Sequence, residues 1–419
     1  MQHSTQTEPD LSTLRSSSNG NVDSWRARRY DGDMDRARFE SSDFGTIVDD
    51  DEIGFAWFNP APIRRDLKLD PQTLLALSRA DEALGQLAGI GRLLPNPQLL
   101  IGPYAYKEAL ASARIEGTQA DLEDVFQSGR GKPPRSDVFT VNNYRAALSE
   151  GFDLIRCEGR FDFSVVARVH SLLLGVEGDS ALSAVRKRPV WLGSPTDRPE
   201  TAVYVPPVDG AVTEAIADWN AYLSEPPPLP ALVRAAILHY QFLTIHPFMD
   251  GNGRAGRLLV LLFLAAEKRL PVPLLYLSPY FEERRREYYD RLQMVRERGE
   301  LQEWCQFFLT AVEVQAKDGV ARADRLLTMR ERYRAELFGS RNRAIEVVDM
   351  IFENPVLTSS AVRDQLDVTT QGALNLIRGL EAKGWVEQVG QSGRGGAKLW
   401  MASEIFAAMT DPIALPDVP

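Results

Sequence analysis

Apolar positions recur every three or four residues through most of the chain, which is the spacing of amphipathic helices. This pattern predicts helices over residues 70–94, 103–126, 142–154, 163–174, 231–245, 255–268, 279–298 and 301–317. It breaks between residues 186 and 210, where Pro and Gly surround two β-prone pieces, VWLG and AVYV, that predict a β-hairpin. The fold is therefore expected to be mainly α, with one hairpin interrupting a helical body.

A second unit follows towards the C-terminus. Helices are predicted over residues 342–352, 358–366 and 369–383, followed by two short β-like pieces around a Gly-rich turn. Three helices and a two-stranded wing are typical of a winged helix-turn-helix. Residues 341–400 carry seven basic and seven acidic side chains, a poor electrostatic footprint for DNA. A protein partner or a homodimer contact is therefore favoured slightly, and DNA contact through Arg394 and Lys398 stays open.

The other segments complete a division of the 419 residues into units. The first fifty residues are polar and lack a periodic apolar face, so they cannot offset the entropy of ordering. The expected units are a disordered tail over 1–50, an N-terminal helical region over 51–160, a catalytic core over 161–320, a linker helix over 321–340, the winged helix-turn-helix over 341–405 and a tail over 406–419.

Composition indicates the class of protein. Hydrophobic residues make up 44% and charged residues 25%, the usual balance of a soluble globular protein. The longest apolar run, Leu258 to Ala266, has nine residues, whereas a bilayer span needs about twenty, so no membrane association is expected. Two cysteines and a polar N-terminus argue against a disulfide framework and a secretory signal, which favours the cytoplasm. The net charge of −10 gives no global attraction to nucleic acid.

The stretch HPFMDGNGRAGR, residues 246–257, carries the most chemistry. A buried helix is predicted to end before it, because Pro247 disfavours helical dihedral angles at His246. Two glycines then allow the backbone to approach a ligand closely, and a second buried helix begins near Arg254. Several backbone N–H groups would therefore face one point at a helix N-terminus. The sequence predicts an anion site suited to phosphate.

The side chains of this stretch suit the same purpose. Arg254 and Arg257 lie three residues apart on the new helix, so both can reach one anion. Asp250 would be repelled by phosphate unless it holds a cation, and Mg²⁺ is the usual one. His246 is a natural general base for an incoming hydroxyl. A zinc site of His239, His246 and Asp250 is a weaker alternative.

This stretch resembles, without mismatch, the Fic motif HPFx(D/E)GNGRxxR, where Fic stands for filamentation induced by cAMP. The resemblance covers residues from about 65 to 317 and includes the hairpin and the piece LYLSPYFEERRREYYDRLQ. With the C-terminal unit, the chain is similar to two-domain bacterial Fic proteins. The resemblance implies a Fic-fold protein adenylyltransferase that moves AMP from ATP to a Tyr, Thr or Ser hydroxyl and releases pyrophosphate. Gly253 argues against a kinase-like branch that has Lys at this position.

The resemblance also implies roles for individual residues. His246 would deprotonate the target hydroxyl, and Phe248 would anchor the loop. Asp250 would hold Mg²⁺ between the α- and β-phosphates. Arg254 would bind the β-phosphate and Arg257 the γ-phosphate. The implied nucleotide-binding set is Asp250, Gly251, Asn252, Gly253, Arg254, Arg257 and, contacting the base, Tyr288.

An inhibitory segment is implied further upstream. The piece SARIEG resembles the family motif (S/T)xxxE(G/N), with Ser112, Glu116 and Gly117 at its defining positions. Glu116 would pair with Arg257 and leave ATP bound in an unreactive alignment. In some relatives the same glutamate removes AMP, and the sequence leaves open whether it does so here.

The hairpin would act as a flap that docks the target as an added strand. Its edge strand would be formed by Thr201, Ala202, Val203, Tyr204 and Val205. A purely structural hairpin is the alternative for this segment. Two rival functions also stay open, a nucleotide-sensing DNA-binding regulator and a Fic-fold transferase with another nucleotide donor.

Overall fold

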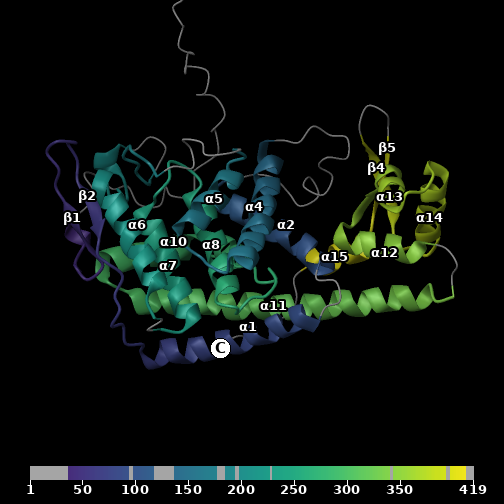
Figure 1. Cartoon of the computed structure of the whole chain (residues 1–419), viewed down its shortest axis with the longest axis horizontal. Coiled ribbons are helices and arrows are strands. Elements are labelled where there is room, and N and C mark those ends of the chain that lie inside the picture. The colour runs from purple at the N-terminus through teal and green to yellow at the C-terminus, as the bar shows by residue number, and fades with distance from the viewer. Residues whose placement is uncertain are drawn as a thin grey trace, which may run out of the picture.

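The computed structural model describes residues 36–93, 98–117, 136–176, 185–193, 198–226, 229–339, 343–392 and 397–411. Most of these residues are helical, and the chain forms a helical body with a smaller unit at one end (Figure 1). The helices of the body are α1 (Pro71–Leu93), α2 (Gln98–Ile115), α4 (Ser136–Glu158), α5 (Phe163–Leu173), α6 (Asp209–Ser224), α7 (Ala231–Ile245), α8 (Asn252–Ala266), α9 (Ser278–Glu283), α10 (Arg285–Arg298) and α11 (Leu301–Glu336). The mainly α fold predicted from periodicity is confirmed.

Helices α7 and α8 form the centre of the body. Both are apolar around nearly their whole circumference, and such helices are stable only when neighbours cover every face. Every residue of α7 from Leu232 to Ile245 is buried. The indole N–H groups of Trp219 and Trp304 donate to carbonyls of α7, at 3.2 and 2.9 Å. The loop between α7 and α8 is therefore held between two rigid, buried elements.

Helix α11 is a single element of 36 residues, about 54 Å long at 1.5 Å per residue. It runs beside α1 and continues to the C-terminal unit (Figure 1). The predicted boundary between a core ending at 320 and a separate linker helix over 321–340 is therefore wrong. Buried residues continue at helical spacing across it, including Ala323, Leu326 and Tyr333.

The C-terminal unit contains α12 (Ala344–Glu353), β3 (Val356–Thr358), α13 (Ser359–Leu366), α14 (Thr370–Ala382), β4 (Glu387–Ser392), β5 (Ala397–Met401) and α15 (Ser403–Thr410). Its three strands form an antiparallel sheet in the order β3-β5-β4. The three predicted helices lie within one or two residues of α12, α13 and α14. The winged helix-turn-helix assignment stays a prediction. The tail expected from residue 406 is wrong for 406–410, since Ala408 and Met409 of α15 are buried.

Part of the expected N-terminal tail is ordered. Within residues 36–50 the structure has the 3-10 helix η3 (Arg36–Arg38) and strand β1 (Gly45–Val48), which pairs with β2 (Trp57–Pro60). The expectation of disorder is therefore wrong for this part, and residues 1–35 lie outside the described residues. Gly45 allows the pairing, because a Cβ there would lie 2.4 Å from the Phe58 ring.

Among the residues described between 185 and 205, the expected hairpin retains one bridge. Leu192 and Tyr204 exchange backbone hydrogen bonds of 2.8 and 3.2 Å, and residues 194–197 lie outside the described residues. Thr201 ends the 3-10 helix η4 (Pro199–Thr201), so the predicted edge strand over 201–205 is wrong. The reason is packing. Ala202 and Tyr204 are buried, and the Tyr204 hydroxyl donates to the Thr244 carbonyl at 2.7 Å. The docking of a target along this segment stays a prediction.

None of the described helices combines the length and the apolar composition needed to cross a bilayer.

Candidate active site

His246 terminates α7 in a left-handed backbone conformation, with φ 51° and ψ 59°. This conformation is rare for a residue with a side chain and is found where neighbouring contacts enforce it. Its Nδ1 lies 3.4 Å from the Leu243 carbonyl. Because a carbonyl oxygen only accepts, this contact assigns the ring proton to Nδ1 and leaves the Nε2 lone pair available as a base. Burial and the cation of Arg186 lower the pKa of His246 to about 4, so the imidazole is neutral at physiological pH.

The loop after His246 leads into an uncapped helix N-terminus. Gly251 adopts φ 74°, and α8 begins at Asn252 without a side-chain cap for its first N–H groups. Such free N–H groups at the positive end of a helix bind anions. The Asn252 side chain instead holds the loop, donating to the Phe248 carbonyl at 2.8 Å and accepting from the Phe248 N–H at 2.9 Å. The Asn252 side chain therefore fixes the loop, while its backbone N–H belongs to the uncapped first turn of α8.

Asp250 and Arg254 lie at the mouth of this site. The Asp250 side chain is 78% exposed, accepts from the Gly251 N–H at 2.6 Å and lies 3.6 Å from the Arg254 guanidinium. Arg254 is mostly buried, and its Nε–H is a buried donor with no hydrogen-bond partner among the described residues. A buried donor without a partner is costly and marks a position where a ligand completes the structure. The arrangement suits a phosphate oxygen beside the α8 N-terminus.

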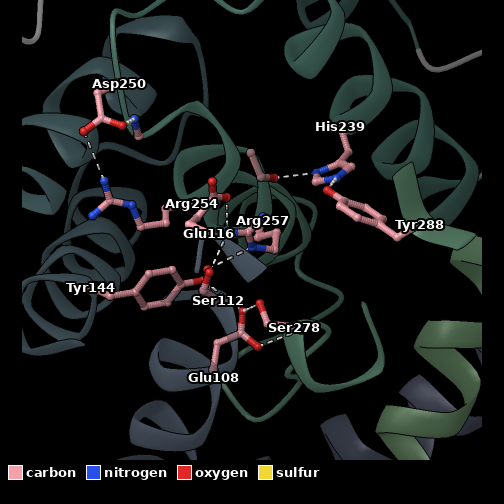
Figure 2. Close-up of polar contacts among 12 residues, drawn as sticks. Glu108, Ser112, Glu116, Tyr144, His239, Asp250, Arg254, Arg257, Ser278 and Tyr288 are labelled. Carbon is pink, nitrogen blue, oxygen red and sulfur yellow. Dashed lines mark hydrogen bonds and ion pairs between the residues drawn. The ribbon is translucent and has the colours of Figure 1, made fainter. Parts of the chain in front are cut away.

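Arg257 is hydrogen-bonded to the end of helix α2 and to Glu116, which follows it (Figure 2). Its Nη2 donates to the Glu116 carboxylate and to the Ser112 carbonyl, both at 2.8 Å, and its Nε donates to the Ser112 hydroxyl at 2.9 Å. The ion pair expected between Glu116 and Arg257 is therefore present. Gly117 follows with φ 99°, a conformation that ends α2 at the point where Glu116 reaches the site.

Electrostatics keep this pair ionised. Desolvation alone would raise the pKa of Glu116, but Arg257, helped by Arg254 and His246, lowers it below its ordinary value. Burial alone would lower the pKa of Arg257, and Glu116 raises it instead. Both groups are charged at neutral pH, so the contact between them persists there.

A buried acid beneath Ser112 holds α2 in place. Glu108 is 1% exposed and accepts from the Tyr144 hydroxyl, the Ser278 N–H and the Ser278 hydroxyl. These partners belong to α4 and α9, and Figure 2 shows them together below Arg257. Burial raises the pKa of Glu108. This network was not predicted from the sequence. Its only signal was the four-residue spacing of Glu108, Ser112 and Glu116 on one face of a helix.

His239 and Tyr288 are core residues. The His239 ring bonds to the Gly256 carbonyl through Nδ1 at 2.6 Å and to the Tyr288 hydroxyl through Nε2 at 2.8 Å. Both nitrogens are used, and burial lowers the pKa of His239 to about 3, so the zinc alternative is wrong. Among the described residues no group of His, Cys, Asp and Glu could hold a metal by itself. The expected contact of Tyr288 with a base is also wrong, because its side chain is fully buried.

A residue that the sequence analysis did not single out lies directly behind the base. The Arg186 guanidinium donates from Nε to the His246 carbonyl at 2.7 Å. His170 supports the other side of the loop, with its Nε2 2.7 Å from the Asp250 carbonyl and its ring stacked on Phe248. Their partners are main-chain carbonyls, which no pattern of side chains indicates.

Comparison with known proteins identifies the family. A model of the Fic/DOC family matches residues 160–264, which include the whole loop, and one of the Fic/DOC family N-terminal region matches residues 74–153, which include Glu116. The stretch of residues 74–264 belongs to the Fic/DOC family. A crystal structure of a Fic family protein from Desulfovibrio desulfuricans covers 81% of this chain and 98% of its own, with a TM-score of 0.51 and 21% identity. That likeness shows a Fic fold.

Curated relatives match over shorter regions. Protein adenylyltransferase fic-1 of Caenorhabditis briggsae is 29% identical over 109 residues, 26% of this chain and 20% of that protein. Protein adenylyltransferase Fic of Culex quinquefasciatus is 29% identical over 147 residues, 35% of this chain and 26% of that protein. The matched regions thus span about a quarter of the length of these relatives.

Proposed function

We propose that this protein is a protein adenylyltransferase that transfers AMP from ATP to a Tyr, Thr or Ser hydroxyl of a protein. The observation that carries the proposal lies in the loop of residues 246–257. There, a neutral imidazole with a free Nε2 precedes an uncapped helix N-terminus flanked by Arg254 and Arg257. The names of the curated relatives support the same reaction.

The reaction needs one base and a site for phosphate charge. The target hydroxyl gives its proton to Nε2 of His246 while its oxygen attacks the α-phosphorus of ATP. The bond from the α-phosphorus to the oxygen bridging the α- and β-phosphates breaks, and pyrophosphate leaves with that electron pair. The N–H groups of the first turn of α8 and the guanidinium of Arg254 stabilise the negative charge. The left-handed backbone of His246 fixes the position of the base.

The residues present fit a magnesium ion that arrives with the nucleotide. Mg²⁺ typically takes one or two protein carboxylates together with phosphate oxygens and water. Asp250 offers one exposed carboxylate next to the proposed phosphate site. When bound there, Mg²⁺ would neutralise charge on the phosphates. Asp250 is the residue that would hold it.

We also propose that Glu116 keeps the enzyme inactive. Its carboxylate occupies Arg257 and lies against the first turn of α8, since a Cβ on Gly253 would lie 2.1 Å from Glu116 Oε1. A negative group in this place competes with the terminal phosphate of ATP for the same cation and the same N–H groups. Release of Glu116 would therefore allow ATP to align for attack.

The test is intact-protein mass spectrometry after incubation with ATP and Mg²⁺. The wild type is compared with Glu116→Gly and with Glu116→Gly combined with His246→Ala. Glu283→Gly serves as the matched control, because Glu283 also ends a helix and pairs with an arginine, but in a 71%-exposed position. We expect an AMP-sized increment on Glu116→Gly alone.

The same variants are then incubated with cell lysate and with labelled ATP, CTP, GTP or UTP. Labelling of lysate proteins from ATP alone supports the proposed donor when the chain does not modify itself. Labelling from another nucleotide would point to a different donor. No labelling by Glu116→Gly from any of the four would overturn the proposal.

A further inference from the structure

Arg186 connects the end of α7 to the segment that precedes α6. Its side chain is 4% exposed. Beyond the bond from Nε to the His246 carbonyl, Nη2 donates to the Ile245 carbonyl at 3.3 Å and to the Pro207 carbonyl. Its own N–H donates to the Pro247 carbonyl at 2.9 Å. One residue thus binds three consecutive carbonyls around the left-handed turn at His246.

These carbonyls need a partner. The last four carbonyls of a helix have no partner within it, and they carry the negative end of the helix dipole. The buried guanidinium of Arg186 satisfies two of them, those of Ile245 and of the cap residue His246, and interacts favourably with that dipole. The left-handed backbone of His246 is also a conformation that only over-determined surroundings maintain. The bonds from Arg186 provide that constraint on both sides of His246.

We propose that Arg186 is the positioning residue for the general base, holding the His246 backbone in the turn that directs Nε2 to the phosphate site. The role of His246 as the base rests on the function proposed above. Arg186 touches the backbone of His246, so it acts through the histidine and not on the substrate.

The charge of Arg186 has a second effect on the same imidazole. The charged groups that face His246 are Arg186, Glu116, which follows α2, and Arg296 from α10. Burial and Arg186 lower the pKa of His246, Glu116 opposes them, and Arg296 contributes least. Replacing Arg186 with a neutral residue therefore raises the pKa of His246. The protonated, inactive form of the base then persists to higher pH.

The experiment uses Arg186→Gln and Arg186→Lys in the full chain. Arg322→Gln is the matched control, because Arg322 is also buried, at 2% exposed, and donates to two carbonyls at the end of a helix, those of Ala408 and Met409 in α15. The control therefore reproduces the loss of a buried, helix-capping arginine far from His246 in the sequence. Circular dichroism establishes that each variant is folded.

The first readout is the titration of His246 by NMR of ¹⁵N-labelled histidine, which needs no activity. The chain has four histidines, so His246 is assigned by its loss in His246→Ala. We expect a higher pKa and a less uniform Nδ1–H tautomer in Arg186→Gln than in the wild type. Arg186→Lys, which keeps the charge but not the fork of donors, is expected to restore the pKa and not the tautomer. An unchanged titration and tautomer in Arg186→Gln would overturn the proposal.

The second readout is AMP transfer in the Glu116→Gly background. We expect kcat to fall about 10- to 100-fold for Arg186→Gln, a part of what a positioned base contributes, with KM for ATP changed less than about twofold. The acidic limb of the pH profile is expected to move to higher pH. A fall in kcat no larger than that caused by Arg322→Gln would overturn the proposal. If Glu116→Gly transfers no AMP at all, the proposed reaction fails, and the NMR titration still decides the role of Arg186.

Discussion

The carboxylate of Glu116 is packed against the α-carbon of Gly253, in the first turn of α8. A Cβ at position 253 would lie 2.1 Å from Glu116 Oε1 and 3.1 Å from Arg257 Nη1. The absence of a side chain at Gly253 is therefore a condition for the contact between α2 and α8. The residue that shapes the phosphate site also makes room for the group that occupies it.

Replacing this glycine tests the contact directly. Gly253→Ala is expected to displace the flexible end of the Glu116 side chain and to lower the free energy of unfolding by at most about 1 kcal/mol, the value of a partly exposed ion pair. In the Glu116→Gly background most of that cost is expected to disappear. Gly379→Ala is the control, since nothing lies within 4 Å of its Cβ position and alanine favours a helix. Urea unfolding of the four variants measures how far the effect of Gly253→Ala depends on Glu116. An equal loss of unfolding free energy with and without Glu116 would contradict the contact between Gly253 and Glu116.

The inhibition proposed for Glu116 is expected to be insensitive to pH in the physiological range. The pKa of Glu116 lies below its ordinary value of 4.5 because Arg257 outweighs the desolvation of the carboxylate. A group of this kind contributes stability above its unfolded pKa and loses it only as the pH falls through its folded pKa. The ratio of AMP transfer by Glu116→Gly to that by the wild type should thus stay constant between about pH 6 and pH 8. A ratio that collapses within this window would mean that another group controls the contact.

Glu108 is expected to govern both the stability and the inhibition. Glu108→Gln replaces one acceptor oxygen with an N–H₂ group, which then faces a donor on Tyr144 or Ser278. A buried donor left without an acceptor costs about 1–3 kcal/mol of unfolding free energy. Because Glu108 fixes the helix that carries Glu116, AMP transfer should rise at the same time. Glu82→Gln, on the exposed surface of α1, should change neither the free energy of unfolding nor AMP transfer. If Glu108→Gln lowers the free energy of unfolding without raising AMP transfer, Glu108 stabilises the fold but does not govern the inhibition.

The protein should lose stability in mild acid. Burial lowers the pKa of His239 to about 3, far below the ordinary 6.5. The unfolded chain then binds more protons than the folded one, so unfolding free energy falls as the pH drops below about 6.5. The slope from one such histidine is at most about 1.4 kcal/mol per pH unit. Urea unfolding at several pH values should show a shallower slope for His239→Gln, and an identical slope would contradict a neutral, buried His239.

The site divides into a part that the sequence predicts and a part that it does not. The Pro, Gly and charged residues of the loop from His246 to Arg257 lie within twelve consecutive positions. The sequence alone therefore shows their combination and predicts a phosphate site. Glu116 lies 141 residues before Arg257, and only the resemblance to a family motif connects them. Arg186 and Glu108 were missed because buried polar partners become visible only when distant elements meet.

The fold shows the same division. The periodicity of α7 predicts its bounds because nearly every position is apolar. The strand over 201–205 fails because β-prone residues such as Tyr204 are equally suited to burial against α7, and there packing overrides propensity. Strands β1 and β2 are four residues each, too short to stand out from a polar segment.

Helix α2 belongs to both parts of the molecule, because it packs on α4 and α9 of the body and on α12 of the C-terminal unit. Lys107 of α2 also lies 3.7 Å from Asp318 of α11, which accepts from the Arg322 that caps α15. Helix α2, which leads into Glu116, therefore connects the two parts. A rotation of the C-terminal unit relative to the body would displace α2 along its length. The ion pair between Glu116 and Arg257 is the contact that such a displacement would weaken.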